Sequence, residues 1–400
     1  SIAIWCGNNE NDEGWHNWGW QKQFNYSKAD STQIWNDYKK VFHEMIPQTL
    51  DSLLPKEKNI YWSSSPSIGW GRKESLLQGD SHYWGVWWGK EPFEIYEKKV
   101  GRFMSEYGFQ GMPNLETLQK VMNKEDLNFT SEAFKNHQKH PTGYETINEY
   151  MERDYVVPKD FEDYLYVSQL LQARGMKTAI EAHRRAKSYC MGTLYWQFND
   201  CWPVTSWSSL DYYGNWKAFH YQAKRSFENV LLSAEVTDSG VYKFFVINDG
   251  MQNYAGELKA EIRNFKGQLL WEKKAYCKSD ASSNVAAILL PFPSLKEIDT
   301  QNSYIKLEFI SDDNHWESNF FFEKPKDLKL SKPNIQIKAI DGVTIEIFSD
   351  VLAKDVFLSS ENDTFFEENY FDLLPNEKRI IKLSKPVQNI KVKSLFDTMK

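Results

Sequence analysis

Cysteine is scarce in this sequence, since 400 residues contain only four, at positions 6, 190, 201 and 277. They are far apart and form no C-x-x-C pair, which argues against a disulfide framework and against a zinc knuckle. We therefore expect the four to be buried thiols.

Excess positive charge and long apolar runs are lacking as well. Lys and Arg total 48 against 55 Asp and Glu, which gives a net charge of −7. Nucleic acids and anionic membranes are bound through excess Lys and Arg, so neither is an expected partner. The sequence contains no run of 18 apolar residues, which excludes a membrane-spanning helix of ordinary length.

Tryptophan, in contrast, is abundant and unevenly placed. Of 16 Trp residues, only Trp271 and Trp316 follow residue 217. A single core does not readily accommodate the others, because each indole needs room and a partner for its N–H. We expect some of them to line an open cleft, although ordinary packing is the alternative for any one residue. Aromatic faces in a cleft suit sugars, whose C–H faces are apolar and whose rims are polar.

The first 228 residues alternate short apolar stretches with helical ones, which favours an α/β fold with a parallel sheet. The predicted strands cover residues 2–6, 59–62, 81–84, 102–104 and 191–198.

Two helices are predicted between these strands. One begins near Asp30 or Ser31, either of which is a suitable N-cap, and the other covers residues 160–188. The first helix has apolar residues on one face, at Ile34, Tyr38, Val41, Phe42 and Met45.

Beyond Phe227 the pattern changes to alternating strands separated by turn signals, as at residues 241–247, 258–262 and 304–309. This pattern predicts an antiparallel β-sandwich. Residues 335–340 and 343–348 flank Asp-Gly, which predicts a hairpin. We therefore predict three domains: an α/β domain over residues 1–228 and two small immunoglobulin-like β-sandwiches over residues 229–325 and 326–400.

Two of the predicted strands lead into an acidic residue. The sequence WCGNNE ends at Glu10, and FMSEYG contains Glu106. In a barrel of parallel strands the carboxyl-terminal ends share one face, so these two glutamates would converge. Two carboxylates among aromatic side chains are what glycoside hydrolysis requires. The alternative for each glutamate is an ordinary surface salt bridge.

These segments resemble glycoside hydrolase family 2, and within it the β-mannosidases. WCGNNE is similar to the acid/base motif, and MSEYG, residues 104–108, to the nucleophile motif. GDSHY, residues 79–83, and SSPS, residues 64–67, are similar to segments that follow the intervening strands. MGTLYWQFND, residues 191–200, is similar to the last barrel strand and the rim of its active site.

The resemblance implies a retaining exo-hydrolase that removes terminal β-D-mannose by double displacement, with no metal and no cofactor. Glu10 would be the acid/base, with a pKa raised by burial and by nearby negative charge, and Glu106 the nucleophile. The substrate-binding residues that it implies are Asn9, Trp18, His82, Trp196, Asn199 and Asp200. Trp18 and Trp196 favour mannose over galactose or glucuronate. For Trp18 the alternative to sugar binding is packing within a loop, and for His82 it is a structural role. Asn199 and Asp200 could either orient the rim of the site or cap a loop.

A closed (β/α)8 barrel has eight strands, and this sequence predicts about five. We therefore expect the chain to be the carboxyl-terminal part of a longer enzyme and to be poorly active alone. Its expected partners are a mannose-containing oligosaccharide and the missing amino-terminal domains of the same enzyme. Formation of a homodimer is a further possibility. The location stays open too, with the bacterial periplasm favoured over a lysosome-like compartment. The alternatives are a β-galactosidase or β-glucuronidase of the same family and a non-catalytic carbohydrate-binding protein.

Overall fold

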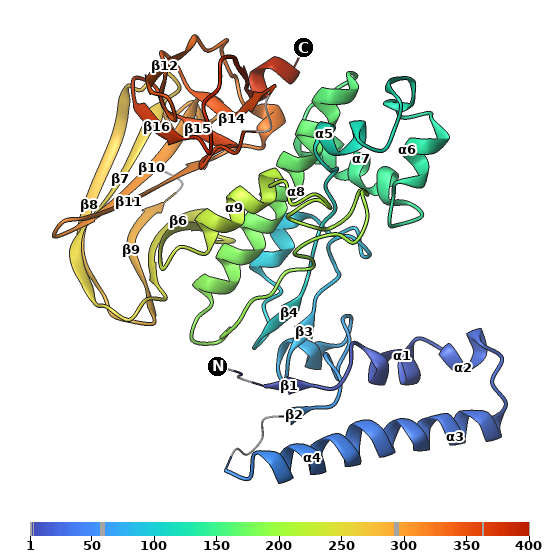
Figure 1. The fold of residues 1–400 in the computed structure, drawn as a ribbon. Helices are drawn as coiled ribbons and strands as arrows, with labels where there is room; N and C mark the ends of the chain where they lie inside the picture. Colours follow the sequence, from blue (N-terminus) through green and yellow to red (C-terminus); the bar gives the residue numbers. More distant parts are fainter. Residues whose placement is uncertain (1, 3, 57–60, 292–295, 362–363, 400) are drawn as a thin grey trace. The chain divides into compact units, whose positions relative to one another are not determined.

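A computed structural model describes residues 2, 4–56, 61–291, 296–361 and 364–399 (Figure 1). The chain divides into two compact units. The first contains residues 1–108 and 188–195, and the second contains residues 109–187 and 196–400. Of the predicted strand residues, Ala3, Asn59 and Ile60 lie outside the described part.

The first unit combines very short parallel strands with helices. Its helices are α1 (Asn11–Asn17), α2 (Trp20–Gln23), α3 (Lys28–Lys39), the π-helix η1 (Lys40–Met45), α4 (Ile46–Leu53) and the 3₁₀ helices η2 (Lys73–Leu76) and η3 (Phe93–Glu97). Its strands are β1 (Trp5–Cys6), β2 (Tyr61–Trp62), β3 (Ser81–His82) and β4 (Met104–Glu106). β1 pairs with β2 and β3 with β4, both in parallel, as the α/β pattern predicts.

Several details of this unit differ from the sequence-based expectations. Ser27, not Asp30 or Ser31, caps α3, because it forms a capping box with Asp30 at the third helical position. Residues 191–198 form no strand. Instead, Thr193 makes a single parallel bridge to Met104. The predicted strand over residues 2–6 is shortened to Trp5–Cys6, and its apolar residues Ile2, Ile4 and Trp5 are exposed.

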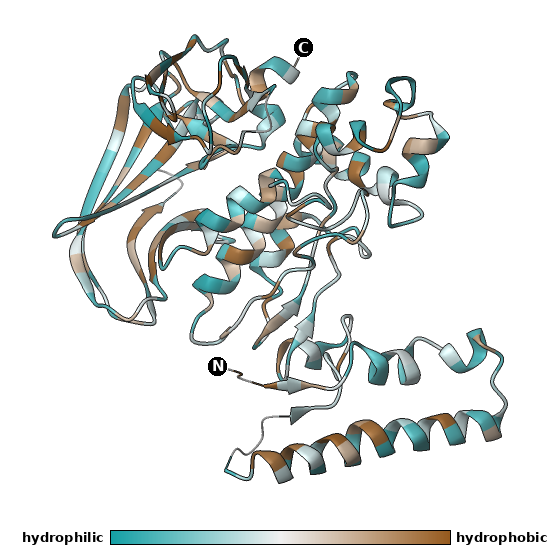
Figure 2. Ribbon diagram, viewed as in Figure 1, coloured by the Kyte–Doolittle hydropathy of each residue, from teal (hydrophilic) through white to brown (hydrophobic). Residues whose placement is uncertain are grey.

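The helix of α3, η1 and α4 keeps the predicted apolar spacing, and Figure 2 shows hydrophobic residues recurring along it. Ile34, Val41 and Met45 are nevertheless exposed. The expectation of four buried thiols is also only half right. Cys190 and Cys277 are buried, whereas Cys6 and Cys201 are exposed.

The second unit begins with helices. They are α5 (Leu115–Gln119), α6 (Glu132–Asn136), α7 (Gly143–Asp154), α8 (Phe161–Arg185), α9 (Ala218–Ser226) and the 3₁₀ helix η4 (Lys124–Asp126). The predicted helix over residues 160–188 is α8, and the Asp160 side chain caps it by accepting from the Asp163 N–H. Tyr164, Leu165 and Leu171 are buried along it, as the apolar spacing predicts.

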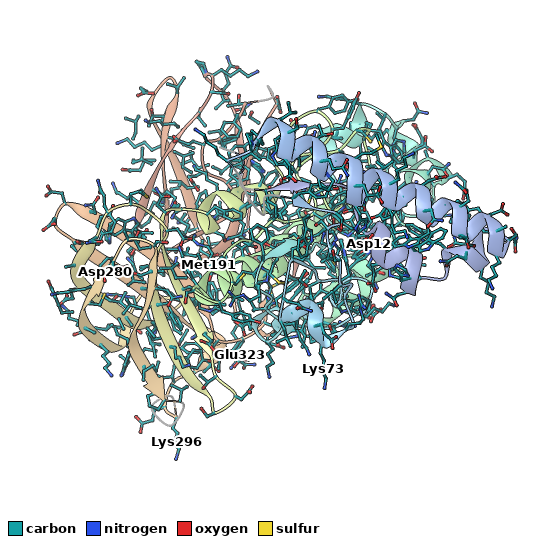
Figure 3. The ribbon with its side chains drawn as sticks, turned by 90° about the horizontal axis from the view of Figure 1, so that it is seen from below. Asp12, Lys73, Met191, Asp280, Lys296 and Glu323 are labelled. Atoms are coloured by element: carbon teal, nitrogen blue, oxygen red, sulfur yellow. The ribbon has the colours of Figure 1, made fainter. Side chains whose placement is uncertain are left out.

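The rest of this unit is antiparallel β structure. Its first sandwich joins the sheet β5-β6-β9 to the sheet β11-β10-β7-β8 around one apolar core that includes Phe244, Ile262 and Leu307. Asp280, which follows β8 of this sandwich, is labelled in Figure 3. Its strands are β5 (Val230–Val236), β6 (Val241–Asn248), β7 (Tyr254–Asn264), β8 (Leu269–Ser279), β9 (Ser283–Pro291), β10 (Ser303–Ser311) and β11 (Asn314–Phe321).

The second sandwich contains the sheets β12-β13-β16 and β15-β14-β17 around a separate core. The predicted hairpin is formed by β12 and β13, which pair in antiparallel register from Ile335 opposite Ser349. The strands are β12 (Ile335–Asp341), β13 (Thr344–Ser349), β14 (Ala353–Ser360), β15 (Phe371–Leu373), β16 (Lys378–Lys382) and β17 (Ile390–Lys393). Short 3₁₀ helices are η6 (Thr300–Asn302), η7 (Pro325–Asp327) and η8 (Leu395–Thr398).

No helix in the described part of the chain has both the length and the apolarity needed to cross a bilayer.

Candidate active site

Glu10 is held at the end of β1 by close backbone packing. At Gly7, which follows the strand, an added Cβ would lie 2.4 Å from the carbonyl oxygen of Ser63, so only glycine fits without a shift. The Glu10 N–H then donates to the Ser65 carbonyl over 2.9 Å, and the Ser65 N–H donates to the Asn8 carbonyl over 3.0 Å. Glu10 has a φ of 60°, in the left-handed region that non-glycine residues rarely occupy. Such strained backbone is concentrated at functional sites.

Glu106 is the last residue of β4 and lies opposite His82 of β3. The two residues are direct neighbours in the parallel pairing, and the register shifts between Ser81 and His82. The Tyr83 N–H donates to the Glu106 carbonyl over 2.8 Å, which fixes the end of the pairing. Both side chains are buried: Glu106 is 8% exposed and His82 is 3% exposed.

The two glutamates meet at the His82 imidazole. His82 Nδ1 lies 2.8 Å from Glu10 Oε1 and 3.6 Å from Glu106 Oε2. One oxygen of each carboxylate and the ring nitrogen all lie within 4.8 Å of one another. The structure therefore brings together Glu10, which follows β1, His82 of β3 and Glu106 of β4.

The electrostatic environment of Glu106 is dominated by its burial. Burial raises the pKa of Glu106, and the charge of Glu10 adds to this effect, while His82 and the Trp84 hydrogen bond oppose it. This raised pKa belongs to the residue that the resemblance assigns as the nucleophile. Trp84 Nε1 donates to Glu106 Oε1 over 3.1 Å, which stabilises the ionised form that a nucleophile requires.

Three contributors to this cluster had no predicted role. Trp84 is the indole donor to Glu106. Ser65 Oγ lies 3.1 Å from His82 Nε2, and its hydroxyl donates to Asp80 Oδ2 over 2.5 Å. Ser65 lies in SSPS and Asp80 in GDSHY, the two segments that resemble sequences following the intervening strands. This resemblance is the sequence signal that could have pointed to both residues.

Asn9 is exposed at the end of β1, where it forms a parallel bridge to Ser65 through the backbone. Asn8, which was not predicted, orders the turn. Its Nδ2 donates to the Ser63 carbonyl and to Tyr38 Oη, each over 2.9 Å, and its Oδ1 accepts from the Asn11 N–H. The Tyr38 hydroxyl also donates to Asp12, which is labelled in Figure 3.

An aromatic pocket of about 450 Å³ opens directly after this turn. Trp35 stacks on Trp15, with ring centroids 6.1 Å apart, and on Tyr38, at 4.9 Å. Trp18 is 49% exposed and packs edge-on against Trp20, which does line the pocket. The pocket thus fits the expectation that tryptophans line an open cleft. Its aromatic lining consists of Trp15, Trp20, Phe24, Tyr26, Trp35 and Tyr38.

The remaining predicted residues belong to the second unit. Trp196 and Asn199 are exposed, and the Asn199 carbonyl accepts from Gln197 Nε2. Asp200 is buried, and its Oδ1 forms an ion pair with Lys139 Nζ at 3.0 Å. Asp200 Oδ2 accepts the hydroxyl protons of Ser206 and Ser208. Because protein groups occupy both of its oxygens, Asp200 fits the loop-ordering role better than a direct contact with sugar.

The same three side chains offer one imidazole and two carboxylates, which are also ligand types for zinc. Half-buried Glu308 and exposed His315 and Glu317 form a second such group. The sequence-based expectation of a metal-free site therefore stays a prediction.

Comparisons with known proteins find similarity to mannosidases in domains, overall fold and sequence. A model described as a Mannosidase Ig/CBM-like domain matches residues 240–327, and one described as an Ig-fold domain matches residues 330–398. The crystal structure of the β-D-mannosidase from Dictyoglomus thermophilum covers 98% of this chain with a TM-score of 0.82 and 28% identity.

The chain is also similar in sequence to β-mannosidases. The β-mannosidase of Rattus norvegicus is 29% identical over 399 residues, which cover 92% of this chain and 43% of the relative. β-Mannosidase B of Thermothelomyces thermophilus is 25% identical and covers 99% of this chain, which spans 50% of that relative. The predicted resemblance to the β-mannosidases of glycoside hydrolase family 2 is thereby confirmed. The chain spans about half the length of these curated relatives.

Other solved structures extend the likeness in fold alone. The exo-chitosanase CsxA of Amycolatopsis orientalis is 14% identical, covers 76% of this chain and has a TM-score of 0.60. It carries no information about the sugar that this chain would bind.

Proposed function

We propose that this chain carries the catalytic pair of a retaining exo-β-mannosidase. The observation that supports the proposal is that the Glu10 and Glu106 carboxylates meet at His82, with ligating oxygens within 4.8 Å of each other. Retaining glycosidases hold their carboxyl groups about 5–5.5 Å apart, whereas inverting enzymes leave about 6.5–9.5 Å for a water molecule. The similarity to β-mannosidases supports terminal β-D-mannose as the sugar.

The reaction has two displacements in this proposal. The ionised Glu106 attacks the anomeric carbon, while Glu10 donates its proton to the departing glycosidic oxygen, and a covalent glycosyl-enzyme results. Glu10 then removes a proton from water, the hydroxide oxygen attacks the anomeric carbon, and Glu106 leaves as a carboxylate. Trp84 stabilises the charge on Glu106 at the beginning and at the end of the cycle.

The proposal includes the domain arrangement. Residues 1–228 contribute the carboxyl-terminal part of a (β/α)8 barrel, followed by two immunoglobulin-like sandwiches over residues 229–325 and 326–400. We propose that the remaining strands come from a further portion of the same enzyme, which also completes the sugar site. The curated relatives are about twice as long as this chain, which supports that arrangement.

Trapping with an activated 2-deoxy-2-fluoro-β-mannoside tests the proposal directly. A retaining enzyme becomes covalently labelled, and mass spectrometry of its peptides is expected to find the label on Glu106. Glu106→Gln is expected to stay unlabelled. A label on Glu10 would reverse the two roles, which the raised pKa of Glu106 makes worth testing.

The choice of sugar is tested by hydrolysis of aryl β-mannoside and aryl β-galactoside, with this chain and with the longer enzyme that contains it. We expect the longer enzyme to prefer the mannoside and this chain alone to turn over little of either. Preference for the galactoside would support a different specificity within the family. Binding of mannosides without hydrolysis or labelling in the longer enzyme would support a carbohydrate-binding protein instead.

A further inference from the structure

A chain of hydrogen bonds leads from Asp80 to the candidate acid. The hydroxyl groups of Ser65 and Ser105 both donate to Asp80 Oδ2, over 2.5 and 2.6 Å. Ser65 Oγ also lies 3.1 Å from His82 Nε2, and His82 Nδ1 lies 2.8 Å from Glu10 Oε1. All five residues belong to the first unit.

The Ser65 hydroxyl decides which ring nitrogen of His82 carries a proton. A serine hydroxyl has a single proton to donate, and Ser65 gives it to Asp80. Ser65 Oγ therefore accepts from His82, so Nε2 must be protonated. Neutral imidazole has only one N–H, which leaves Nδ1 as an acceptor directed at Glu10. This acceptor forms a hydrogen bond with Glu10 only when Glu10 itself carries the proton.

We infer that Ser65 and Asp80 are positioning residues that hold neutral His82 in the Nε2–H tautomer and thereby favour the protonated form of Glu10. This inference rests on the proposed function, in which Glu10 must hold a proton before it can protonate the leaving oxygen. Once that proton has gone, the Nδ1 lone pair faces an ionised Glu10 oxygen. The repulsion favours removal of a proton from water in the second displacement.

Other ionisable groups in the described part of the site influence the protonation of the His82 imidazole. The Glu106 carboxylate, 3.6 Å from Nδ1, favours the imidazolium, whose Nδ1–H would donate to ionised Glu10. Asp80 acts through Ser65. Desolvation and the Asp80 charge raise the pKa of the nearby Cys6 thiol, so Cys6 adds no charge at neutral pH.

Two serine variants separate the contact with His82 from the contact with Asp80. Ser65→Ala removes the hydroxyl that fixes His82 but keeps the backbone carbonyl that accepts from the Glu10 N–H. Ser105→Ala removes the second hydroxyl on Asp80 Oδ2, and Ser105 has no hydrogen bond to the imidazole among those of the described residues. Ser65→Thr restores a hydroxyl at position 65.

The tautomer is measured without any turnover, by two-dimensional NMR of the chain labelled with ¹⁵N-histidine. We expect neutral His82 to show a protonated Nε2 and an unprotonated Nδ1 in the wild-type chain, in Ser105→Ala and in Ser65→Thr. Ser65→Ala is expected to gain the Nδ1–H tautomer. A wild-type His82 protonated at Nδ1, or an unchanged tautomer in Ser65→Ala, overturns the inference.

A kinetic measurement links the tautomer to Glu10 in the active enzyme that contains this chain. In Ser65→Ala, a neutral His82 with Nδ1–H donates to the Glu10 carboxylate and stabilises its ionised form. The basic limb of kcat/KM should move to lower pH by about one unit, as expected when a charged group gains a hydrogen bond. Ser105→Ala should leave that limb in place. An unmoved limb in Ser65→Ala contradicts the inference, whereas activity that survives in Glu106→Gln contradicts the proposed function instead.

Discussion

The candidate site and the first β-sandwich are held together by different kinds of contact. In the sandwich, β7 pairs residue by residue both with the next strand, β8, and with the distant strand β10, and the inward side chains share one core. In the site, Glu10 meets His82 across 72 residues of sequence, and Ser65 meets His82 across 17. The sandwich thus derives its order from continuous strand pairing and apolar burial, whereas the site depends on a few polar side chains at strand ends that the fold brings together.

The two regions also differ in what they bury. Ile262 and Leu307 of the sandwich have no exposed surface, while Glu106 and His82 of the site are buried polar groups. Burial of apolar groups stabilises a fold, whereas burial of charge costs free energy unless the charge is paired. Burial of these polar groups in the candidate site is therefore expected to cost stability, in contrast to the sandwich core.

Removal of the Glu106 carboxylate should have the largest effect, and this effect is on activity. In the active enzyme, Glu106→Gln is expected to lower kcat for an aryl β-mannoside by about 10⁴-fold or more, because the nucleophile is lost. The measurement is initial-rate kinetics together with thermal unfolding of the same sample. Glu125→Gln, at an exposed position, is the control and should retain its rate. A modest loss in Glu106→Gln would mean that this carboxylate is not the nucleophile.

Truncation of an apolar side chain should lower the free energy of unfolding more in the sandwich core than on the exposed face of η1 in the first unit. Ile262→Ala in the sandwich core is expected to lower the free energy of unfolding by about 2–5 kcal/mol. Val41→Ala, at a residue that is 41% exposed, should change it by less than about 0.5 kcal/mol. Urea denaturation measures both. An equal loss in Val41→Ala would show that the apolar face of η1 is covered in solution.

Val41 also illustrates why some of the fold was predictable from sequence and some was not. The Asp-Gly turn between the alternating segments of β12 and β13 indicates that these two strands pair with each other. The hairpin was therefore predicted correctly. The spacing of Ile34, Val41 and Met45 predicted a helix correctly, but periodicity does not reveal whether a face is covered. Capping was misplaced by three residues because the Ser27–Asp30 box lies just upstream of the apolar pattern.

For the site, the convergence of Glu10 and Glu106 was predictable because the ends of parallel strands meet and because each glutamate lies in a recognisable motif. The contacts of Ser65 and Asp80 were not, since nothing in a sequence indicates which hydroxyl faces an imidazole. Asp200 was assigned to substrate binding through its motif, but its environment of Lys139, Ser206 and Ser208 is visible only in three dimensions.

Asp200 provides a smaller test that lies outside both regions of the comparison. Asp200→Asn should lower the free energy of unfolding by about 2–3 kcal/mol, because it leaves Lys139 without its buried counter-charge. Glu132→Gln is the matched control, since it removes an ion pair to Lys135 from a carboxylate that is 83% exposed. Differential scanning calorimetry measures both variants. A negligible effect of Asp200→Asn on stability would return this residue to the candidates for direct sugar contact.

The smallest effect concerns the pH dependence of stability and sharpens the contrast between buried charge and buried apolar surface. Burial raises the pKa of Glu106 above its ordinary value of 4.5, so the folded chain binds this proton more tightly than the unfolded chain does. The stability that Glu106 contributes is fully present below pH 4.5 and is lost as the pH rises through the folded-state pKa. Glu106→Gln does not titrate, so its stability relative to wild type should improve over that pH interval. Urea denaturation of both proteins at several pH values measures the difference, with Glu125→Gln as a control that should run parallel to wild type. A difference that stays constant with pH would mean that the proton affinity of Glu106 is the same in the folded and unfolded chains, and that the site carries no cost of buried charge at this position.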